Sequence, residues 1–325
     1  MSTEHKTTQL TMPEGPECYK LAKRMEAILK DSRIIRFEIC GGRYQKHGPP
    51  KGLEEFNQYA ALNNIKVEHI GVKGKLIYII TNSDNVILIT LGLSGTWVKN
   101  KTAYCGVELQ YRNTSSLSAY EVLRKMYFRD KLHYGTLSFV NNAELEKKLK
   151  QLGPDVLDKQ QFTWERFKQI CAKHSKHSLP VVLMNQHYIA GIGNYLKAEI
   201  LYAARASVSS PIADYTEEQL YRVYQVCSTI PYKCTFGKYR LNVYGRKYDP
   251  FGNKVFRVQT KDKRTTHWVP NIMPIDIRLG VEGNLQVTSH IEQSQEDNVT
   301  QTAASNDNDI TSDTLYPIEL SSDSD

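Results

Sequence analysis

The chain contains 325 residues, of which 40% are hydrophobic, so it is long enough to bury the cores of two domains. No stretch approaches the roughly 18 consecutive apolar residues of a membrane span, and residues 1–12 lack the apolar core of a secretory signal. All 42 Lys and Arg lie in residues 1–281 with 25 of the 35 acids, a net charge near +17. Such a basic body indicates a polyanionic partner, nucleic acid first of all.

The first half of the chain begins with a helical pattern and continues with strand patterns. Residues 17–30 carry apolar side chains at helical spacing. From about 33 to 140 the pattern changes to short strands, most clearly at 76–81 and 86–91, which the turn residues 82–85 join. Residues 104–111 and 135–140 predict further strands. This half therefore predicts a β-sandwich with an N-terminal helix.

The second half is mainly helical. Helices are predicted at 143–152, 163–171, 180–186, 195–203 and 217–230. The basic segment 238–270 has two short apolar runs around the turn residues 249–253, which predicts a β-hairpin. From about 282 the chain is acidic and poor in large apolar residues, so a disordered tail is predicted.

The six cysteines are not spaced as metal or redox motifs. No two of them form a C-x-x-C pair, which argues against a zinc ribbon or a thioredoxin motif. Because no secretory signal is evident, we expect reduced thiols in an intracellular compartment.

Residues 12–17 read Met-Pro-Glu-Gly-Pro-Glu. When the Met before a proline is removed, the proline becomes a secondary amine that can attack an electrophilic carbon and form an iminium. Alone, such a Pro-Glu pair is ordinary turn chemistry. Its meaning therefore depends on the motifs that accompany it.

Four further motifs follow in the order of a known family. Gly74-Lys75 opens a strand, residues 91–95 read Leu-Gly-Leu-Ser-Gly, residues 153–157 read Gly-Pro-Asp-Val-Leu, and residues 191–201 read Gly-Ile-Gly-Asn-Tyr-Leu-Lys-Ala-Glu-Ile-Leu. With residues 12–17, these motifs resemble the formamidopyrimidine-DNA glycosylase/endonuclease VIII family over about residues 12–275. Most members end in a four-cysteine zinc finger, whereas residues 249–256 and 263–270 contain no cysteine. This segment resembles the zincless finger of the endonuclease VIII-like proteins of eukaryotes and giant viruses.

The resemblance implies an α+β protein of two domains, a β-sandwich with flanking helices and a helix-two-turns-helix domain with a zincless β-hairpin finger. The implied divisions are an extension at 1–12 that is absent from the active form, a catalytic domain at 13–140, a helix-two-turns-helix DNA-binding domain at 141–237, a finger at 238–275 and an acidic tail at 282–325.

The implied activity is that of a base-excision-repair DNA glycosylase with AP lyase activity by β,δ-elimination. By resemblance, Pro13 is the amine nucleophile and Glu14 the acid and base that protonates the sugar. Glu17 supports this centre, although its charge also suits a helix N-terminus. Lys75 contacts phosphates beside the damaged nucleotide. Oxidised pyrimidines and hydantoins are the expected substrates.

The resemblance also implies how DNA is held. Asn194 binds a phosphate flanking the lesion, although Asn at this place also suits a plain helix cap. Gly191 and Gly193 let backbone amides approach that phosphate. Arg264 of the finger completes the grip, because a guanidinium suits an anionic oxygen pair.

The resemblance further implies that side chains of two loops fill the gap left by a flipped nucleotide. The apolar wedge falls on Leu93, and the family's Asp-x-Arg-x-Phe-Gly loop reads Asp-Lys-Leu-His-Tyr-Gly at 130–135. Tyr134 can stand in for Phe, but Leu132 lacks the hydrogen-bond donors of Arg. We therefore expect weak preference for the opposite base.

Two other functions stay open. One is a purine-directed formamidopyrimidine-DNA glycosylase, and the other is a non-catalytic damaged-DNA-binding protein, if the extension is retained and Pro13 has no free amine. The expected partner is damaged DNA, duplex and also single-stranded, bound by a monomer without metal or organic cofactor. The acidic tail is a candidate contact for a protein partner. The nucleus, or a viral replication compartment, is the expected location.

Overall fold

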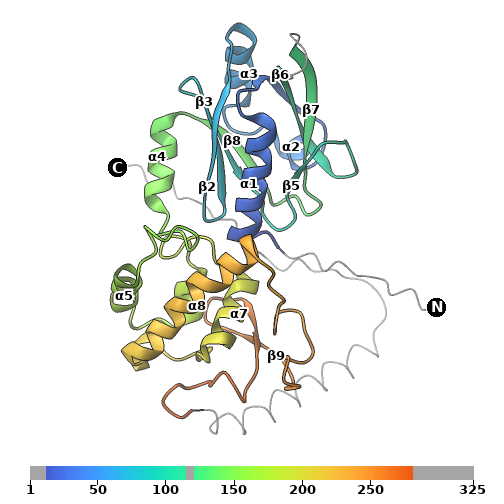
Figure 1. Cartoon of the computed structure of the whole chain (residues 1–325). Helices are drawn as coiled ribbons and strands as arrows, with labels where there is room; N and C mark the ends of the chain where they lie inside the picture. Colours follow the sequence, from blue (N-terminus) through green and yellow to red (C-terminus); the bar gives the residue numbers. More distant parts are fainter. Residues whose placement is uncertain (1–11, 115–120, 281–325) are drawn as a thin grey trace, which may run out of the picture.

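Hydrophobic side chains gather in two large cores, one built from residues 18–139 and one from residues 156–273. A computed structural model describes residues 12–114 and 121–280 of the chain. The first core lies in a β-sheet part and the second in a helical part (Figure 1). The predicted α+β class is thereby confirmed. The predicted tail, and the predicted extension except for Met12, lie outside the described residues.

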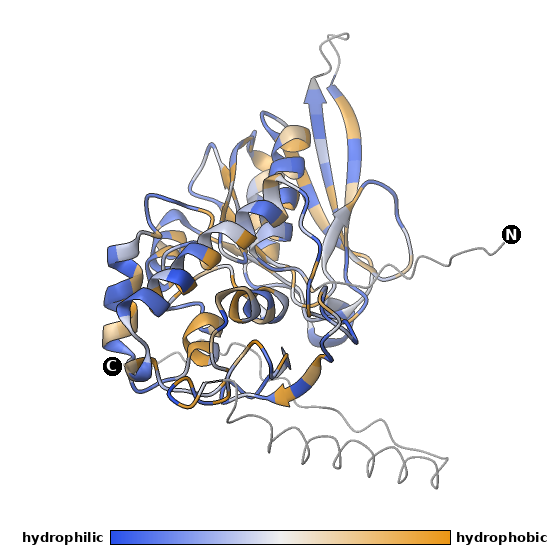
Figure 2. Ribbon diagram, turned by 60° about the horizontal axis from the view of Figure 1, so that its bottom comes forward, coloured by the Kyte–Doolittle hydropathy of each residue, from blue (hydrophilic) through white to orange (hydrophobic). Residues whose placement is uncertain are grey.

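Two four-stranded antiparallel sheets form the sandwich. One has the strand order β1-β6-β7-β5, with β1 at Arg33–Ile39, β6 at Cys105–Thr114, β7 at Glu121–Arg129 and β5 at Thr96–Val98. The other has the order β2-β3-β4-β8, with β2 at Val67–Lys73, β3 at Leu76–Thr81, β4 at Val86–Thr90 and β8 at Thr136–Val140. Along β6, one strand of the long ribbon in Figure 2, hydrophobic and hydrophilic residues alternate from Val107 to Arg112. This alternation is typical of strands with one buried face.

Helix α1 (Gly15–Leu29) buries the face that the sequence predicts, with Leu21, Ala22, Met25 and Leu29 in the core. The expectation of strands alone over 33–140 is wrong at two places, α2 (Arg43–His47) and α3 (Leu53–Leu62). The buried side chains of α3 lie at positions 53, 56 and 60, a helical spacing. Phe56 packs against Phe139 with ring centroids 4.8 Å apart.

The helical part contains α4 (Asn142–Gln151), α5 (Trp164–Lys173), α6 (Leu179–Met184), α7 (Asn194–Ala204), the short 3-10 helix η1 (Ile212–Asp214) and α8 (Glu217–Phe236). Every residue of α7 from Tyr195 to Tyr202 is buried, so this helix is the centre of its domain. The predicted end of the last helix at 230 is wrong. Helix α8 continues through Pro231, and Phe236 meets the ring of Tyr19 in α1 at 5.2 Å. This contact between the two domains stabilises the last turn of α8.

The finger is a hairpin of β9 (Phe256–Gln259) and β10 (Thr265–Trp268), so its turn lies at 260–264. The predicted hairpin exists, but its turn was expected at 249–253. Those residues do form a turn, in which the Asp249 carboxylate accepts hydrogen bonds from the N–H groups of Phe251 and Asn253, 2.9 and 2.8 Å. Asp249 also accepts from the Tyr202 hydroxyl of α7 at 2.9 Å, which ties the turn to the domain core.

Candidate active site

The Glu14 side chain is buried, with 1% of its surface exposed, and it reaches from the first domain to the second. Its carboxylate accepts hydrogen bonds from the N–H groups of Gly193, Tyr195 and Leu196 at 2.7, 2.9 and 3.2 Å. These groups lie at the N-terminus of α7, where amides lack partners within the helix and favour negative charge. Glu14 therefore caps a helix that lies about 180 residues later in the chain.

This environment changes the acidity of Glu14. Burial raises the pKa of the Glu14 carboxyl from 4.5 to about 7, although the nearby Lys75 ammonium and the three amides favour the charged form. A carboxyl with this pKa is present in both protonation states at neutral pH. It can therefore donate a proton in one step and accept one in the next.

Because Gly193 has no side chain, the charged groups of Glu14 and Lys75 can both lie against its backbone. A Cβ atom at this position would lie 2.3 Å from the Glu14 carboxyl carbon and 2.6 Å from the Lys75 Nζ atom. Both groups therefore pack directly on the glycine backbone, and no larger residue fits without moving them.

Lys75 and Glu17 complete the charged centre. Part of the Lys75 side chain is exposed, but burial of its ammonium group lowers its pKa, against the opposing effect of Glu14. Glu17 accepts a hydrogen bond from the Glu14 N–H at 3.0 Å and from the Tyr195 hydroxyl at 3.1 Å. Glu17 thus fixes the backbone between Pro13 and α1, and Tyr195 is a supporting residue that the sequence analysis did not single out.

Pro13 lies directly before this centre and is half-buried. It precedes Glu14 in the extended segment that leads into α1. The predicted nucleophile and the predicted acid are thus neighbours at the place where the two domains meet. In a chain that includes the preceding residues, the Pro13 nitrogen belongs to an amide bond.

Gly191 serves the contact between the domains. Its carbonyl accepts from the Gly15 N–H at 2.8 Å, and its own N–H donates to the Gln186 side chain at 3.0 Å. A Cβ at Gly74 would lie 2.7 Å from the Gly191 nitrogen. The N–H groups of Gly191 and Gly193, expected to face a phosphate, are thus engaged within the protein. Their role in phosphate binding stays a prediction.

Asp155 joins the same contact and had no predicted role. Its carboxylate accepts hydrogen bonds from the N–H groups of Gly74 at 2.7 Å and Leu157 at 3.0 Å. Gly74 has a φ of 57°, which favours glycine, and it immediately precedes Lys75. Asp155 therefore holds the turn that presents Lys75. The sequence places this acid in a family motif, but no local pattern indicates its partner.

The two predicted phosphate ligands of the second domain lie side by side. The Asn194 amide donates to the Thr265 carbonyl at 2.9 Å, next to Arg264 in the finger. Arg264 is half-buried, and its charge lowers the pKa of Lys75. The structure thus brings Asn194, Arg264 and Lys75 together from three separate segments.

The three predicted gap-filling residues lie on two adjoining loops. Leu132 and Tyr134 are 49% and 45% exposed, so both side chains lie at the surface, and their role in filling a gap in DNA stays a prediction. A Cβ at Gly92 would lie 2.7 Å from the Tyr134 Cβ, so the loop of half-buried Leu93 rests against that of Tyr134.

Asp130 joins these loops. Its carboxylate accepts from the Ser94 hydroxyl and from the Gly135 N–H, the latter at 2.6 Å. The Leu132 N–H in turn donates to the Ser94 hydroxyl at 2.9 Å. The first residue of the predicted loop motif is therefore its structural anchor.

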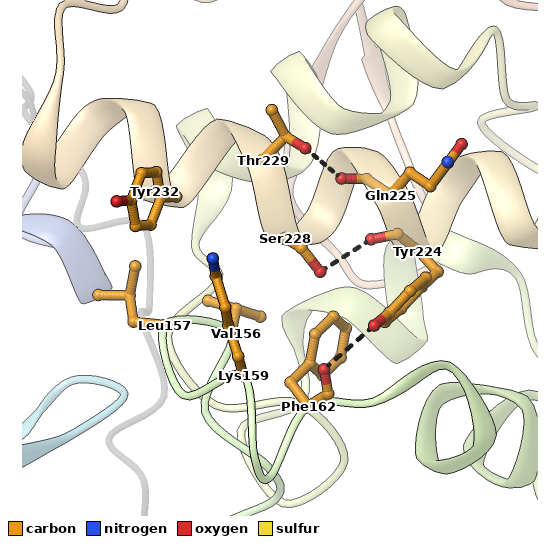
Figure 3. A pocket seen from close by; sticks show the side chains of 9 residues that line it. All are labelled: Val156, Leu157, Lys159, Phe162, Tyr224, Gln225, Ser228, Thr229 and Tyr232. Atoms are coloured by element: carbon orange, nitrogen blue, oxygen red, sulfur yellow. Dashed lines mark hydrogen bonds between the residues drawn. The ribbon is translucent and has the colours of Figure 1, made fainter.

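Other features of the described residues lie away from this centre. A pocket of about 320 Å³ lies between the loop around Lys159 and helix α8, and none of the predicted site residues lines it (Figure 3). Within residues 12–114 and 121–280, no three His, Cys, Asp or Glu side chains are grouped to hold a metal ion. None of the helices described is both long and apolar enough for a membrane span.

Two family models match the chain in sequence order. The model of the formamidopyrimidine-DNA glycosylase N-terminal domain matches residues 12–131, and that of the formamidopyrimidine-DNA glycosylase H2TH domain matches residues 152–234. Together they cover more than half of the chain.

Bacterial relatives carry two different names. A formamidopyrimidine-DNA glycosylase of Bradyrhizobium sp. is 26% identical over 206 residues, 60% of this chain and 68% of the relative. An endonuclease 8 of Klebsiella pneumoniae is 26% identical over 213 residues, 64% and 74% of the two chains.

Solved structures share the fold. The Lactococcus lactis formamidopyrimidine-DNA glycosylase, bound non-covalently to DNA containing an AP site, has a TM-score of 0.68 and 18% identity, with 81% of this chain and 100% of that chain covered. The Thermus thermophilus MutM protein has a TM-score of 0.65 and 21% identity, with 80% and 98% covered.

Proposed function

Because the chain belongs to the formamidopyrimidine-DNA glycosylase/endonuclease VIII family, we propose that it excises oxidised bases from DNA and then cleaves the abasic strand. The observation that carries this proposal is the buried Glu14 carboxyl, which follows Pro13 directly in the chain and lies at the contact between the domains. Its pKa is raised to about 7. Perturbed acids at such places are typical of catalytic sites.

In the first step, the free amine of Pro13 attacks C1′ of the damaged nucleotide, and the base leaves with the bonding electron pair and takes up the proton that the amine loses. Glu14 donates its proton to the sugar ring oxygen, so the ring opens and the new C–N bond becomes an iminium. The value of about 7 supports this role, since a substantial neutral fraction of Glu14 is available at neutral pH.

In the second step, the iminium acidifies C2′. Removal of a C2′ proton expels the 3′ phosphate by β-elimination, and a second elimination expels the 5′ phosphate. Glu14, ionised after its first proton transfer, is positioned to accept a proton here. Hydrolysis then releases Pro13.

The same proposal assigns the side chains that hold the phosphates. Lys75, Arg264 and Asn194 would hold the phosphates around the flipped nucleotide, and their convergence supports this assignment. The basic body of the chain supplies the longer-range attraction to DNA. We propose a monomer that works where DNA is repaired, in a nucleus or a viral replication compartment.

Oxidised pyrimidines and hydantoins are the proposed substrates. The finger without cysteines supports this choice, because it resembles that of the zincless endonuclease VIII-like proteins. Because relatives of both names are similar to this chain, a substrate panel decides it: excision of an oxidised pyrimidine should be faster than excision of 8-oxoguanine. The reverse order would favour the purine-directed alternative.

Borohydride trapping tests the proline mechanism. A chain that begins at Pro13 should form a covalent complex with an oligonucleotide containing an oxidised pyrimidine, and a chain that begins at Met1 should not. Replacing Pro13 by Gly exchanges the secondary amine for a primary one, which can still form an imine that borohydride reduces, so this variant is the matched control for amine chemistry. If the chain beginning at Pro13 traps nothing but still binds the lesion, the protein is a damaged-DNA-binding protein.

A further inference from the structure

A buried ion pair joins helix α7 to the finger. The Lys197 Nζ atom lies 2.6 Å from the Asp262 carboxylate, and the two side chains are 0% and 5% exposed. Lys197 belongs to α7, and Asp262 to the turn between β9 and β10. Removing two charges from water is costly, so such a pair contributes little net stability. Its position next to the predicted DNA grip indicates another role.

Asp262 organises the backbone around Arg264. One of its carboxylate oxygens accepts from Lys197, and the other accepts from the Thr260 hydroxyl at 2.5 Å and the Arg264 N–H at 3.4 Å. The Arg264 carbonyl accepts from the N–H of Thr260 at 3.1 Å. Both peptide groups of Arg264 are thus tied to this turn.

Helix α7 holds the turn at a second point. Asn194 donates to the Thr265 carbonyl at 2.9 Å, on the far side of Arg264 from Asp262. Asn194 and Lys197 are three residues apart and therefore lie on one face of α7. One helix face thus grips the finger before and after Arg264.

The turn needs such a tether because its backbone is strained. Lys263 has a φ of 59°, in the left-handed region that non-glycine residues rarely adopt. The surrounding contacts must keep this conformation.

We infer that Lys197 is a positioning residue for DNA binding, which acts through Asp262 to hold Arg264 toward Lys75. Lys197 does not touch DNA, since its side chain is fully buried. The inference rests on the proposed phosphate contact of Arg264.

A double-mutant cycle tests the inference with duplex DNA that carries a tetrahydrofuran abasic-site analogue. Arg264→Ala and Lys197→Met should each weaken binding roughly tenfold, and each should reduce the slope of log affinity against log salt by about 0.9, the value for one phosphate contact. The combined variant should lose no more than about twofold beyond Arg264→Ala, because residues that act through one another are not additive.

Two further variants protect the test against misfolding. Asp262→Asn keeps the shape of the turn and should reproduce the loss, while Lys197→Arg keeps the charge and should recover part of it. Lys168→Met removes a half-exposed lysine that pairs with Glu217 and is the matched control, expected to leave the salt slope unchanged.

Hydrogen exchange of the free protein tests the positioning role of Lys197 separately from the phosphate contact of Arg264. Lys197→Met should speed exchange of amides at 260–266, whatever Arg264 does to DNA. Unchanged exchange, or an additive loss of affinity in the combined variant, overturns the positioning role while the proposed function stands. If Arg264→Ala alone leaves binding and its salt slope unchanged, the phosphate contact fails and the inference falls with it.

Discussion

A buried glutamate whose pKa is raised by folding should make the folded protein less stable as the pH rises. Folding raises the pKa of Glu14 from 4.5 to about 7, so between these values the folded state binds a proton that the unfolded state has lost. Stability falls with pH wherever the folded state binds more protons. Below pH 4.5 both states are protonated, and above pH 7 the full penalty is present and constant.

The size of the effect follows from this window. From pH 5.5 to 7, about 1.5 pH units, folding takes up nearly one proton, which costs on the order of 2 kcal/mol of unfolding free energy. Glutamine cannot titrate, so the stability difference between the Glu14→Gln variant and the wild type isolates this group from the other titrating residues.

The assay is denaturant unfolding of both proteins at pH 5.5, 7 and 8. We expect the variant to gain on the order of 2 kcal/mol relative to the wild type between pH 5.5 and 8. A difference in unfolding free energy between the two proteins that is the same at every pH is not informative. The glutamine side chain accepts hydrogen bonds from the α7 N–H groups less well than a carboxylate does, whatever the pH. Glu146→Gln, at a 69% exposed side chain of α4, is the matched control and should show a much smaller change.

The Glu14→Gln substitution that relieves the stability penalty at high pH should at the same time reduce enzymatic activity. Glu14→Gln removes the proposed acid and base, so lesion excision should slow by at least about 100-fold at every pH. A stability difference that does not depend on pH, or one that favours the wild type as pH rises, would refute the reasoning about burial. Full activity in the variant would refute the proposed role.

Other predictions follow from single contacts. Gly193→Ala should slow lesion cleavage by on the order of 100-fold, because its Cβ displaces Glu14; unchanged kinetics would contradict this packing. Asp155→Ala should cost roughly 1–3 kcal/mol in thermal unfolding, because the buried Gly74 N–H and the partly buried Leu157 N–H lose their acceptor; an unchanged melting temperature counts against that link. Leu132→Arg should create at least about fivefold discrimination among the four opposite bases in cleavage assays, where the wild type shows little. A chain ending at residue 281 should bind DNA more tightly at low salt if the acidic tail competes for the basic body, and equal affinity would refute autoinhibition.

Local patterns predicted the elements more accurately than they predicted where some of them end. The apolar spacing in α1 and α7 is visible in the sequence, because a helix has a short period that one segment contains entirely. The same spacing occurs in α3, but this short helix lies within a region whose other patterns predict strands. The last helix is predicted to end at 230, whereas α8 continues through Pro231 to Phe236, which contacts Tyr19 of the other domain.

The sequence by itself determined the family motifs, the absence of cysteine from the finger and the identity of the residues that chemistry requires. Only the tertiary structure decided their properties. Glu14 has its raised pKa because α7, 179 residues away in sequence, removes it from water and supplies its hydrogen-bond donors. Lys197 meets Asp262, and not another acid, because the finger folds back on α7. Charge and desolvation depend on distances in space, which no local pattern records.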